Sequence, residues 1–176
     1  MKDVNLAIIK GKLVHRFFTP KNFCIATIFD GANNFVKVFI CNENDLRLIQ
    51  GYNINDYIEI EGNIQSTIRE NKNKTTTIFC DRIVDAPYQR MGYKNSFVIR
   101  GTVKRIKVIN NTCWPIFVAT YVNDRYSIIP AVIYYPDVRA YPQEPGEKIC
   151  LMGCVQTTKK TSVNGQTVYY QNYVVK

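Results

Sequence analysis

The feature that most constrains the fold is an internal repeat, because the second half of the chain restates the order of strand-like segments found in the first half. Matched segments recur in the same order at a nearly constant spacing. The pairs are 6–14 with 97–104, 23–29 with 116–122, 35–41 with 128–134, 56–65 with 147–156, and 75–80 with 166–170. Self-similarity at a nearly constant spacing indicates a duplication.

Each half contains five runs rich in Val, Ile, Phe, Tyr and Thr, bounded by Gly, Asn, Asp and Pro, which is typical of β-strands. Residues 42–51 lie between the third and fourth runs of the first half. Asn42 suits a helix N-cap and Gly51 a helix end, which predicts one short helix. In the second half, Pro142 limits a helix within 136–142 to about one turn.

Five strands with a helix between the third and the fourth is the order of an OB-fold, a small Greek-key barrel. Gly11 and Gly101 fall within the first strand of each copy, where that strand must bend to serve both sides of a barrel. We therefore predict an all-β chain with one short helix per repeat, folded as two tandem five-stranded OB-fold barrels in residues 1–88 and 89–176. The join at 85–95 is short, so we expect the barrels to pack together. An all-β sandwich is the main alternative.

Charge suggests a polyanionic partner, because the formal net charge is +9 and the sequence pI is about 9.3. Nucleic acid and an anionic membrane surface both fit such a charge. Residues 1–88 hold eleven Lys and Arg against ten Asp and Glu, whereas residues 89–176 hold twelve against four. The basic character therefore belongs to the second half.

Nothing in the sequence predicts membrane insertion or export. No apolar run approaches the roughly 20 residues that cross a bilayer, and the first residues are too polar for a signal peptide. We expect a cytoplasmic, nucleoid-associated protein.

The six cysteines do not form a metal motif. There is no C-x-x-C, and the single histidine is His15, so we predict no metal and no cofactor. Reduced Cys packs as a small hydrophobe, so the cysteines within apolar strand-like runs are predicted to be buried thiols. These are Cys24, Cys41, Cys80 and Cys150. The chain also has no nucleophile elbow, P-loop or paired acids at a recognisable spacing, which predicts that it is not an enzyme.

Five pieces of the sequence, met in order in both halves, resemble the bacterial single-stranded DNA-binding protein family. They are the opening strand at 5–13, the Thr-Pro turn and second strand at 19–26, the third strand at 128–134, the fourth strand at 62–66 and 153–157, and the hairpin at 164–169. The resemblance implies sequence-independent binding of single-stranded DNA in replication, recombination or mobile-element transfer. It also implies a homodimer, since that family assembles four OB-folds.

The chain departs from that family in three places. The family usually carries two aromatic residues, six positions apart, on its third strand. The matching positions here are Phe35 and Cys41 in the first copy and Ile128 and Tyr134 in the second, so each copy keeps one aromatic. The usual hairpin aromatic is replaced by Arg69 and Lys160. Because the sequence ends at Lys176, we expect no acidic tail for recruiting other proteins.

The third strand of the first half carries the best candidate site. Phe35, Lys37 and Phe39 alternate with apolar residues, and side chains change face at every residue of a strand. We therefore expect these three side chains to point outward as a stacking platform around a lysine. The alternative is that both phenylalanines pack under a loop or in a subunit contact.

Further candidates are aromatic or basic and lie mainly in the second half. They are Trp114, Arg125, Tyr126, Tyr134, Lys159, Lys160, Tyr169 and Tyr173, together with Arg69, Lys72 and Lys74 of the first hairpin. Half-buried tyrosines serve structure as well as binding, Trp114 could close a barrel end, and both hairpins could simply be solvated.

Two other functions remain open. An RNA-binding OB-fold protein would use the same stacking and phosphate contacts. A protein-interaction scaffold would use the aromatic faces to recruit a helicase or a recombinase.

Overall fold

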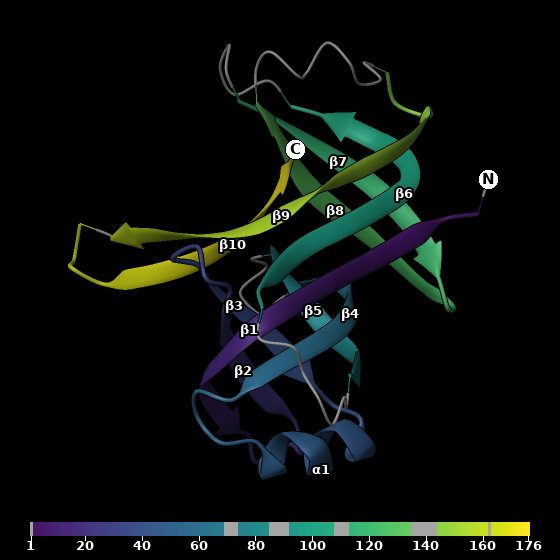
Figure 1. Cartoon of the computed structure of the whole chain (residues 1–176). Coiled ribbons are helices and arrows are strands. Elements are labelled where there is room, and N and C mark those ends of the chain that lie inside the picture. The colour runs from purple at the N-terminus through teal and green to yellow at the C-terminus, as the bar shows by residue number, and fades with distance from the viewer. Residues whose placement is uncertain (1, 69–73, 85–91, 108–112, 135–143, 162) are drawn as a thin grey trace.

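The computed structural model describes residues 2–68, 74–84, 92–107, 113–134, 144–161 and 163–176. The first half contains β1 (Val4–Phe18), β2 (Cys24–Phe29), β3 (Phe35–Ile40), α1 (Glu43–Gly51), β4 (Tyr57–Ile68) and β5 (Lys74–Ile83) (Figure 1). The second half contains β6 (Lys94–Ile106), β7 (Cys113–Val122), β8 (Arg125–Tyr134), β9 (Lys148–Thr161) and β10 (Thr167–Val175).

Each set of five strands closes into a barrel. In the first, β1 pairs with β2 and with β4, β2 pairs with β3, and β5 lies between β4 and β3, the last contact being parallel. Strands β6–β10 repeat the same pairings, with β8 and β10 parallel. The predicted all-β architecture of two tandem OB-folds is confirmed. The second helix predicted at 136–142 and the boundary at 88/89 lie outside the described residues.

Alternating side chains build the interior of each barrel. Ile9 and Leu13 of β1 and Ile99 and Val103 of β6 are fully buried. The side chains that alternate with them point outward; these are Lys10, Lys12, Arg100 and Thr102. Burying one such side chain stabilises the fold by about 1.5–3 kcal/mol relative to leaving it exposed. The two-residue period of the sequence therefore determines which face of each strand forms the core.

Glycines sit where the first strand of each barrel crosses the second. A Cβ on Gly11 would lie 2.0 Å from the carbonyl oxygen of Phe29, and one on Gly101 would lie 2.1 Å from that of Ala119. No real Cβ approaches a backbone oxygen so closely. Each glycine lies beside the point where the first strand passes from its pairing with the fourth strand to its pairing with the second, as expected for a strand that serves both sides of the barrel.

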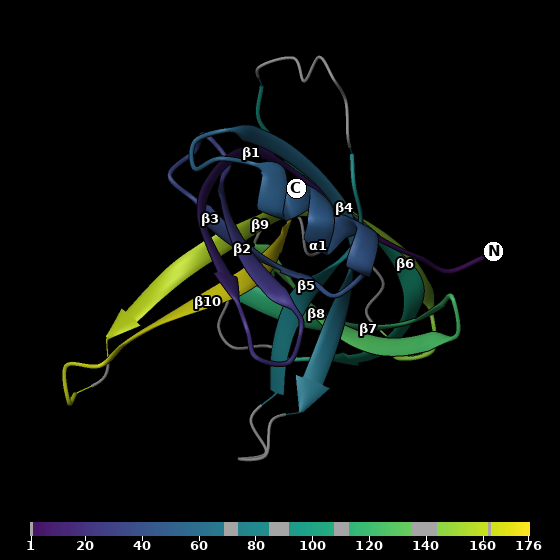
Figure 2. The same ribbon diagram turned by 90° about the horizontal axis from the view of Figure 1, so that it is seen from below.

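Helix α1 lies across the lower end of the first barrel (Figure 2). The side chain of Asn42 accepts a hydrogen bond from the N–H of Asn44 at 2.9 Å, which confirms the predicted N-cap. The carboxylate of Asp45 is buried and accepts from the N–H of Ile83 at 2.8 Å, so it fixes the helix to the end of β5. Arg16 donates to the carbonyl of Ile49 at 2.6 Å and closes the other end of the helix.

The two barrels are joined strand to strand. Antiparallel pairing of β1 with β6 runs from Val4 opposite Arg100 to Lys10 opposite Lys94. Ala7 lies opposite Phe97, its own counterpart in the repeat, so the halves are related by a pseudo-two-fold axis through this pair. The barrels pack together as expected.

The alignment of two repeat segments was wrong. Phe29 corresponds to Ala119 rather than to Val122, because β7 and β8 extend their pairing to a turn at Asn123 and Asp124, whereas β2 and β3 stop at a longer turn. The parallel pairings show the same for the fifth strands. They make Tyr173 the counterpart of Ile78, whereas the repeat alignment expected Tyr169, four residues earlier. Hairpin lengths differ between the copies, so spacing along the sequence does not give the register of these strands.

All six cysteines are free thiols within the described residues, but the prediction of buried thiols was only partly right. Cys24 is buried and Cys80 is half-buried, where burial first and then the carboxylate of Asp45 raise the thiol pKa far above its usual range. Cys41 is exposed because it follows the end of β3, and Cys150 is exposed because it lies on the outward face of β9.

Candidate nucleic-acid interface

The outer face of β3 has the predicted composition. Phe35 is 49% exposed and Lys37 is exposed, whereas Val36 and Val38 between them are fully buried. Phe39 is half-buried and stacks on Phe23, with ring centroids 5.7 Å apart. The predicted alternation is confirmed, and the Phe39 ring is held by its contact with a second ring.

A long hairpin of the second barrel lies against this strand. Strands β9 and β10 project beyond their barrel towards β3 (Figure 1). Thr157 Oγ1 donates to the carbonyl of Phe35 at 2.8 Å, and the N–H of Lys37 donates to Oε1 of Gln171. Within the described strands β3 pairs with β5 only at Val38 and Phe39. The hairpin therefore satisfies backbone groups on the open edge of β3.

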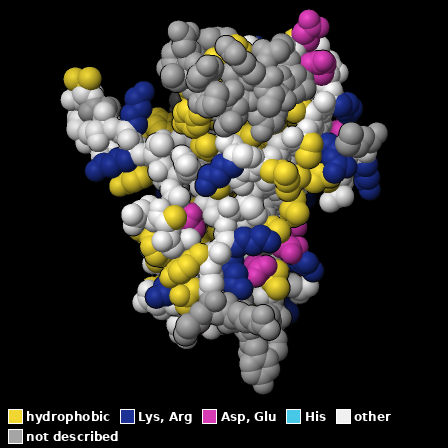
Figure 3. Space-filling model, turned by 45° about the horizontal axis from the view of Figure 1, so that its top comes forward, with side chains coloured by type: hydrophobic (Ala, Val, Ile, Leu, Met, Phe, Trp, Pro, Cys, Tyr) yellow, Lys and Arg dark blue, Asp and Glu magenta, His cyan; other side chains and the backbone are white. Residues whose placement is uncertain are grey.

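An inter-barrel groove of about 660 Å³ runs between β3, β5 and this hairpin. Lys37 and Phe39 line it from the first barrel, and Lys160, Tyr169 and Tyr170 line it from the second. Tyr169 and Tyr170 are each at least half exposed. Basic and hydrophobic side chains also gather on the projecting hairpin at the left of Figure 3. Four predicted site residues from two barrels thus meet in one groove, and Tyr170 joins them.

The second barrel has a reciprocal contact. Ser66 Oγ of β4 donates to the carbonyl of Ile128 at 2.5 Å, and these residues are the repeat counterparts of Thr157 and Phe35. Each barrel thus sends its fourth strand to the third strand of the other. The contact is not fully symmetric, because Pro130, the counterpart of Lys37, has no N–H to donate.

A second groove, of about 590 Å³, lies beside this contact; Ser66, Ile128 and Pro130 line part of it, and we call it the β7–β8 groove. Predicted Tyr126 lines it, but sequence reasoning missed Lys104, Arg105 and Phe117. The Arg105 guanidinium lies 4.6 Å from the centre of the Phe117 ring, close enough for a cation–π contact. The sequence could have indicated Phe117, because it stands between two apolar residues of a strand, Ile116 and Val118. These two are buried, so the ring of Phe117 points outward.

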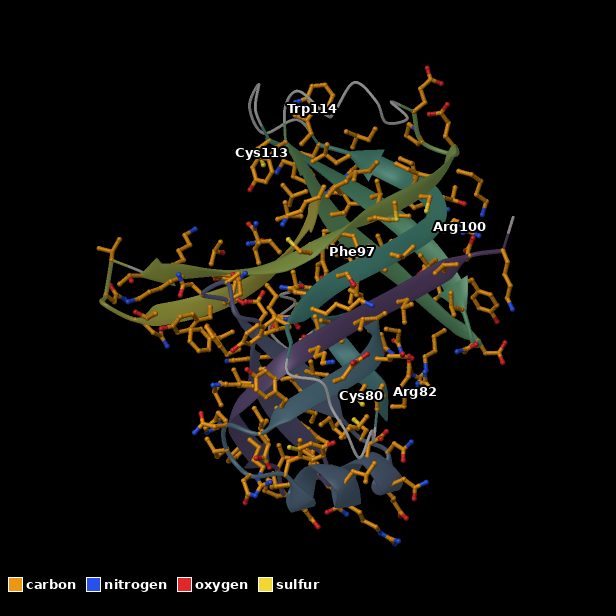
Figure 4. All side chains as sticks on the ribbon, viewed as in Figure 1. Cys80, Arg82, Phe97, Arg100, Cys113 and Trp114 are labelled. Carbon is orange, nitrogen blue, oxygen red and sulfur yellow. The ribbon has the colours of Figure 1, made fainter. Side chains whose placement is uncertain are left out.

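The other predicted residues lie elsewhere. Lys159 is exposed opposite Tyr169 on the hairpin, and Tyr134 is exposed at the end of β8. Arg125 lines a polar pocket of about 130 Å³. Trp114 is partly buried against the core, at the far end of the second barrel in Figure 4. Tyr173 was a wrong candidate, because it is fully buried with its ring 5.9 Å from that of Phe97.

Part of the first hairpin is not described. Arg69 and Lys72 lie outside the described residues, and only the backbone of Lys74 is described. In the part of the chain that the structure describes, no group of three His, Cys, Asp or Glu side chains could hold a metal ion, and no helix is long and apolar enough to span a membrane.

The hydroxyl ties between the barrels can be tested by Thr157→Val, which keeps the side-chain shape. It leaves the carbonyl of Phe35 without this donor, so we expect a loss of about 1 kcal/mol in the free energy of unfolding. Denaturant unfolding measures it. Thr161→Val is the control, since its hydroxyl pairs with Thr167 inside the hairpin. Equal effects of the two changes would contradict a specific tie.

Two closed five-stranded barrels, each with a groove at its third strand, define a tandem OB-fold chain. Solved structures share this fold. A deletion variant of the single-stranded DNA-binding protein from Thermus aquaticus is similar with a TM-score of 0.71 at 12% identity, covering 99% of this chain and 92% of that one. For the wild-type protein of that organism the TM-score is 0.68 at 12% identity, covering 99% and 91%. No protein-family model and no curated protein matches the sequence. The fold expected from the resemblance is thereby confirmed.

Proposed function

We propose that this chain binds single-stranded DNA without regard to sequence, and protects it in replication, recombination or mobile-element transfer. The observation that carries the proposal is the inter-barrel groove, which combines the rings of Phe39, Tyr169 and Tyr170 with Lys37 and Lys160. Single strands are bound by aromatic faces that stack on bases and by cations that follow the phosphates. The shared fold with a protein that binds single-stranded DNA supports this by analogy.

We infer that the protein acts by binding rather than by catalysis. The residues that line the two larger grooves are mainly threonine, lysine, arginine and aromatic, a set suited to phosphates and bases. Such a protein would act in the cytoplasm where single strands are exposed, at the nucleoid. We also propose residues 1–88 and 89–176 as the two domains, since β5 ends at Ile83 and β6 begins at Lys94.

The test is a comparison of single strands with duplex. A dT oligomer is expected to bind far more tightly than duplex of equal length at physiological salt, because stacking needs unpaired bases while charge attracts both. Quenching of tyrosine and Trp114 fluorescence during titration measures both affinities. An rU oligomer in the same series reports the preference for the sugar. Equal affinity for dT and duplex would reject the proposal and leave a generic basic protein.

We further propose that two chains associate, giving an assembly of four OB-folds. Where β1 pairs with β6, from Val4 to Lys10, the outer faces of β1, β6 and β9 form one continuous surface across both barrels, which ends before Lys12. Met152 is 60% exposed on it and lies beside Val98, which pairs with Leu6. On the same face Arg100 has a buried Nε with no partner among the described residues. A second copy would cover the apolar side chains and offer acceptors to that guanidinium.

Met152→Glu is expected to convert a dimer into a 20.3 kDa monomer, because the charge would be buried without a partner at the contact. Sedimentation equilibrium at micromolar concentration measures the mass. Val163→Glu, at a fully exposed position on the hairpin, is the control and should leave the mass unchanged. A wild-type protein that sediments only as a monomer would contradict the association.

A further inference from the structure

A strip of aromatic rings runs round the first barrel, starting at the edge of the inter-barrel groove. The ring of Phe35 lies 5.5 Å from that of Phe29, which lies 6.0 Å from that of Tyr93, which in turn lies 5.6 Å from that of Tyr57. The rings come from β3, β2, the segment before β6, and β4. We call these four residues the aromatic strip.

The strip is both open and held in place. Phe35 is 49% and Tyr93 46% exposed, while Phe29 is half-buried between them and contacts both rings. The hydroxyl of Tyr57 lies 3.2 Å from that of Tyr93. Rings fixed by such contacts lose little conformational entropy when a ligand stacks on them.

The turn between β2 and β3 provides a seat for Tyr93. Gly31 has a φ of +83°, and a Cβ there would lie 2.6 Å from Cγ of Tyr93. Any other residue at this position would push the ring away. The Tyr93 ring is therefore held on one side by this turn while 46% of the residue stays open to a ligand.

A cation accompanies the strip. Lys12 Nζ lies 5.6 Å from the centre of the Tyr57 ring, and Lys12 forms no ion pair among the described residues. Aromatic faces interleaved with a lysine are the features that bind unpaired bases and phosphates. The strip is separate from the inter-barrel groove, whose lining does not include Lys12, Phe29, Tyr57 or Tyr93.

We propose that the aromatic strip binds a second segment of single-stranded DNA, which continues from the inter-barrel groove past Phe35 and round the first barrel to Tyr57. This inference rests on the proposed function and adds a binding track to it. It requires that a strand long enough to leave the groove makes contacts that a short strand does not make.

The experiment compares two lengths of dT, one of about 8 nucleotides, which suits a single OB-fold, and one of about 30, which spans several such sites. In Tyr93→Ala the affinity for the long oligomer is expected to fall about tenfold, and the number of nucleotides covered per chain should fall as well. The affinity for the short oligomer should not change. Tyr93→Phe is the matched control, because it keeps the ring and removes only the hydroxyl bonded to Tyr57.

Each outcome is decisive. Unchanged affinity of Tyr93→Ala for both lengths would overturn the strip and leave the proposed function intact, since the wild-type protein would still bind. Equal losses for both lengths, or a loss in Tyr93→Phe as large as in Tyr93→Ala, would show a structural role instead of stacking and also overturn it. Failure of the wild-type protein to bind either oligomer would overturn the proposed function and the strip together. Ile54→Ala, at another exposed apolar position of the first barrel, controls for general loss of stability.

Discussion

Phe35→Ala is expected to weaken binding of a dT oligomer by about 1–3 kcal/mol without changing the dependence of binding on salt. The half-exposed ring of Phe35 offers a stacking face but carries no charge, so its removal releases no counterion contact. Fluorescence titration at several salt concentrations gives both the affinity and the slope.

Replacing Lys159 and Lys160 together by Ala is the complementary change. Each phosphate contact contributes about 0.7 to the slope for single strands, so the pair should flatten it by about one to two contacts. Lys2→Ala, at an exposed position near the N-terminus, should leave the slope unchanged. If the pair has no effect while Lys37→Ala flattens the slope strongly, the phosphate contacts belong to the first barrel, and the basic second half faces something else.

Gly101→Ala is expected to cost about 3–5 kcal/mol of the free energy of unfolding, a large part of the 5–15 kcal/mol that holds a typical domain together. The added methyl group would lie 2.1 Å from the carbonyl oxygen of Ala119 and only 3.0 Å from its carbon. Both are backbone atoms of the neighbouring strand, so no side chain can move aside. Denaturant unfolding followed by circular dichroism measures the loss.

Gly51→Ala is the matched control for that change. Gly51 closes helix α1, and a Cβ there would meet no atom within 4 Å. Since Ala is favoured over Gly in helices, this variant should be as stable as the wild-type protein or up to about 1 kcal/mol more stable. Equal losses at both glycines would contradict the crowding at the crossing of β6 and β7.

Features set by neighbours in the sequence were predictable. The alternation around Lys37 determines which side of β3 faces outward, and Asn42 caps α1 because the first helical N–H groups lack partners. The repetition of five strands and the glycine in each first strand were enough to predict the barrel topology. Strand alternation and helix capping depend only on nearby residues, and the five-strand order could be checked because it occurs in both halves.

Features that depend on distant segments were not predictable. Nothing near Gln171 indicates that its side chain accepts from the backbone of Lys37, and nothing near Tyr93 indicates a seat on Gly31. Arg105 likewise becomes part of a groove only because β6 carries it beside Phe117 of β7. Unequal hairpin lengths also hid the correct register, so Tyr173 appeared to be a surface residue although it is buried.

The pairing of Ala7 with Phe97 joins the first strands of the two barrels within one chain. In a symmetric dimer of separate chains every substitution occurs twice, and assembly depends on concentration. In this chain the partner is always present through the covalent link, and each half carries its own residues. Lys37 therefore lines the inter-barrel groove, while its repeat counterpart Pro130 lines the β7–β8 groove. A single strand bound across both barrels, as proposed above, would therefore meet two unlike surfaces, with a lysine in one groove and a proline in the other.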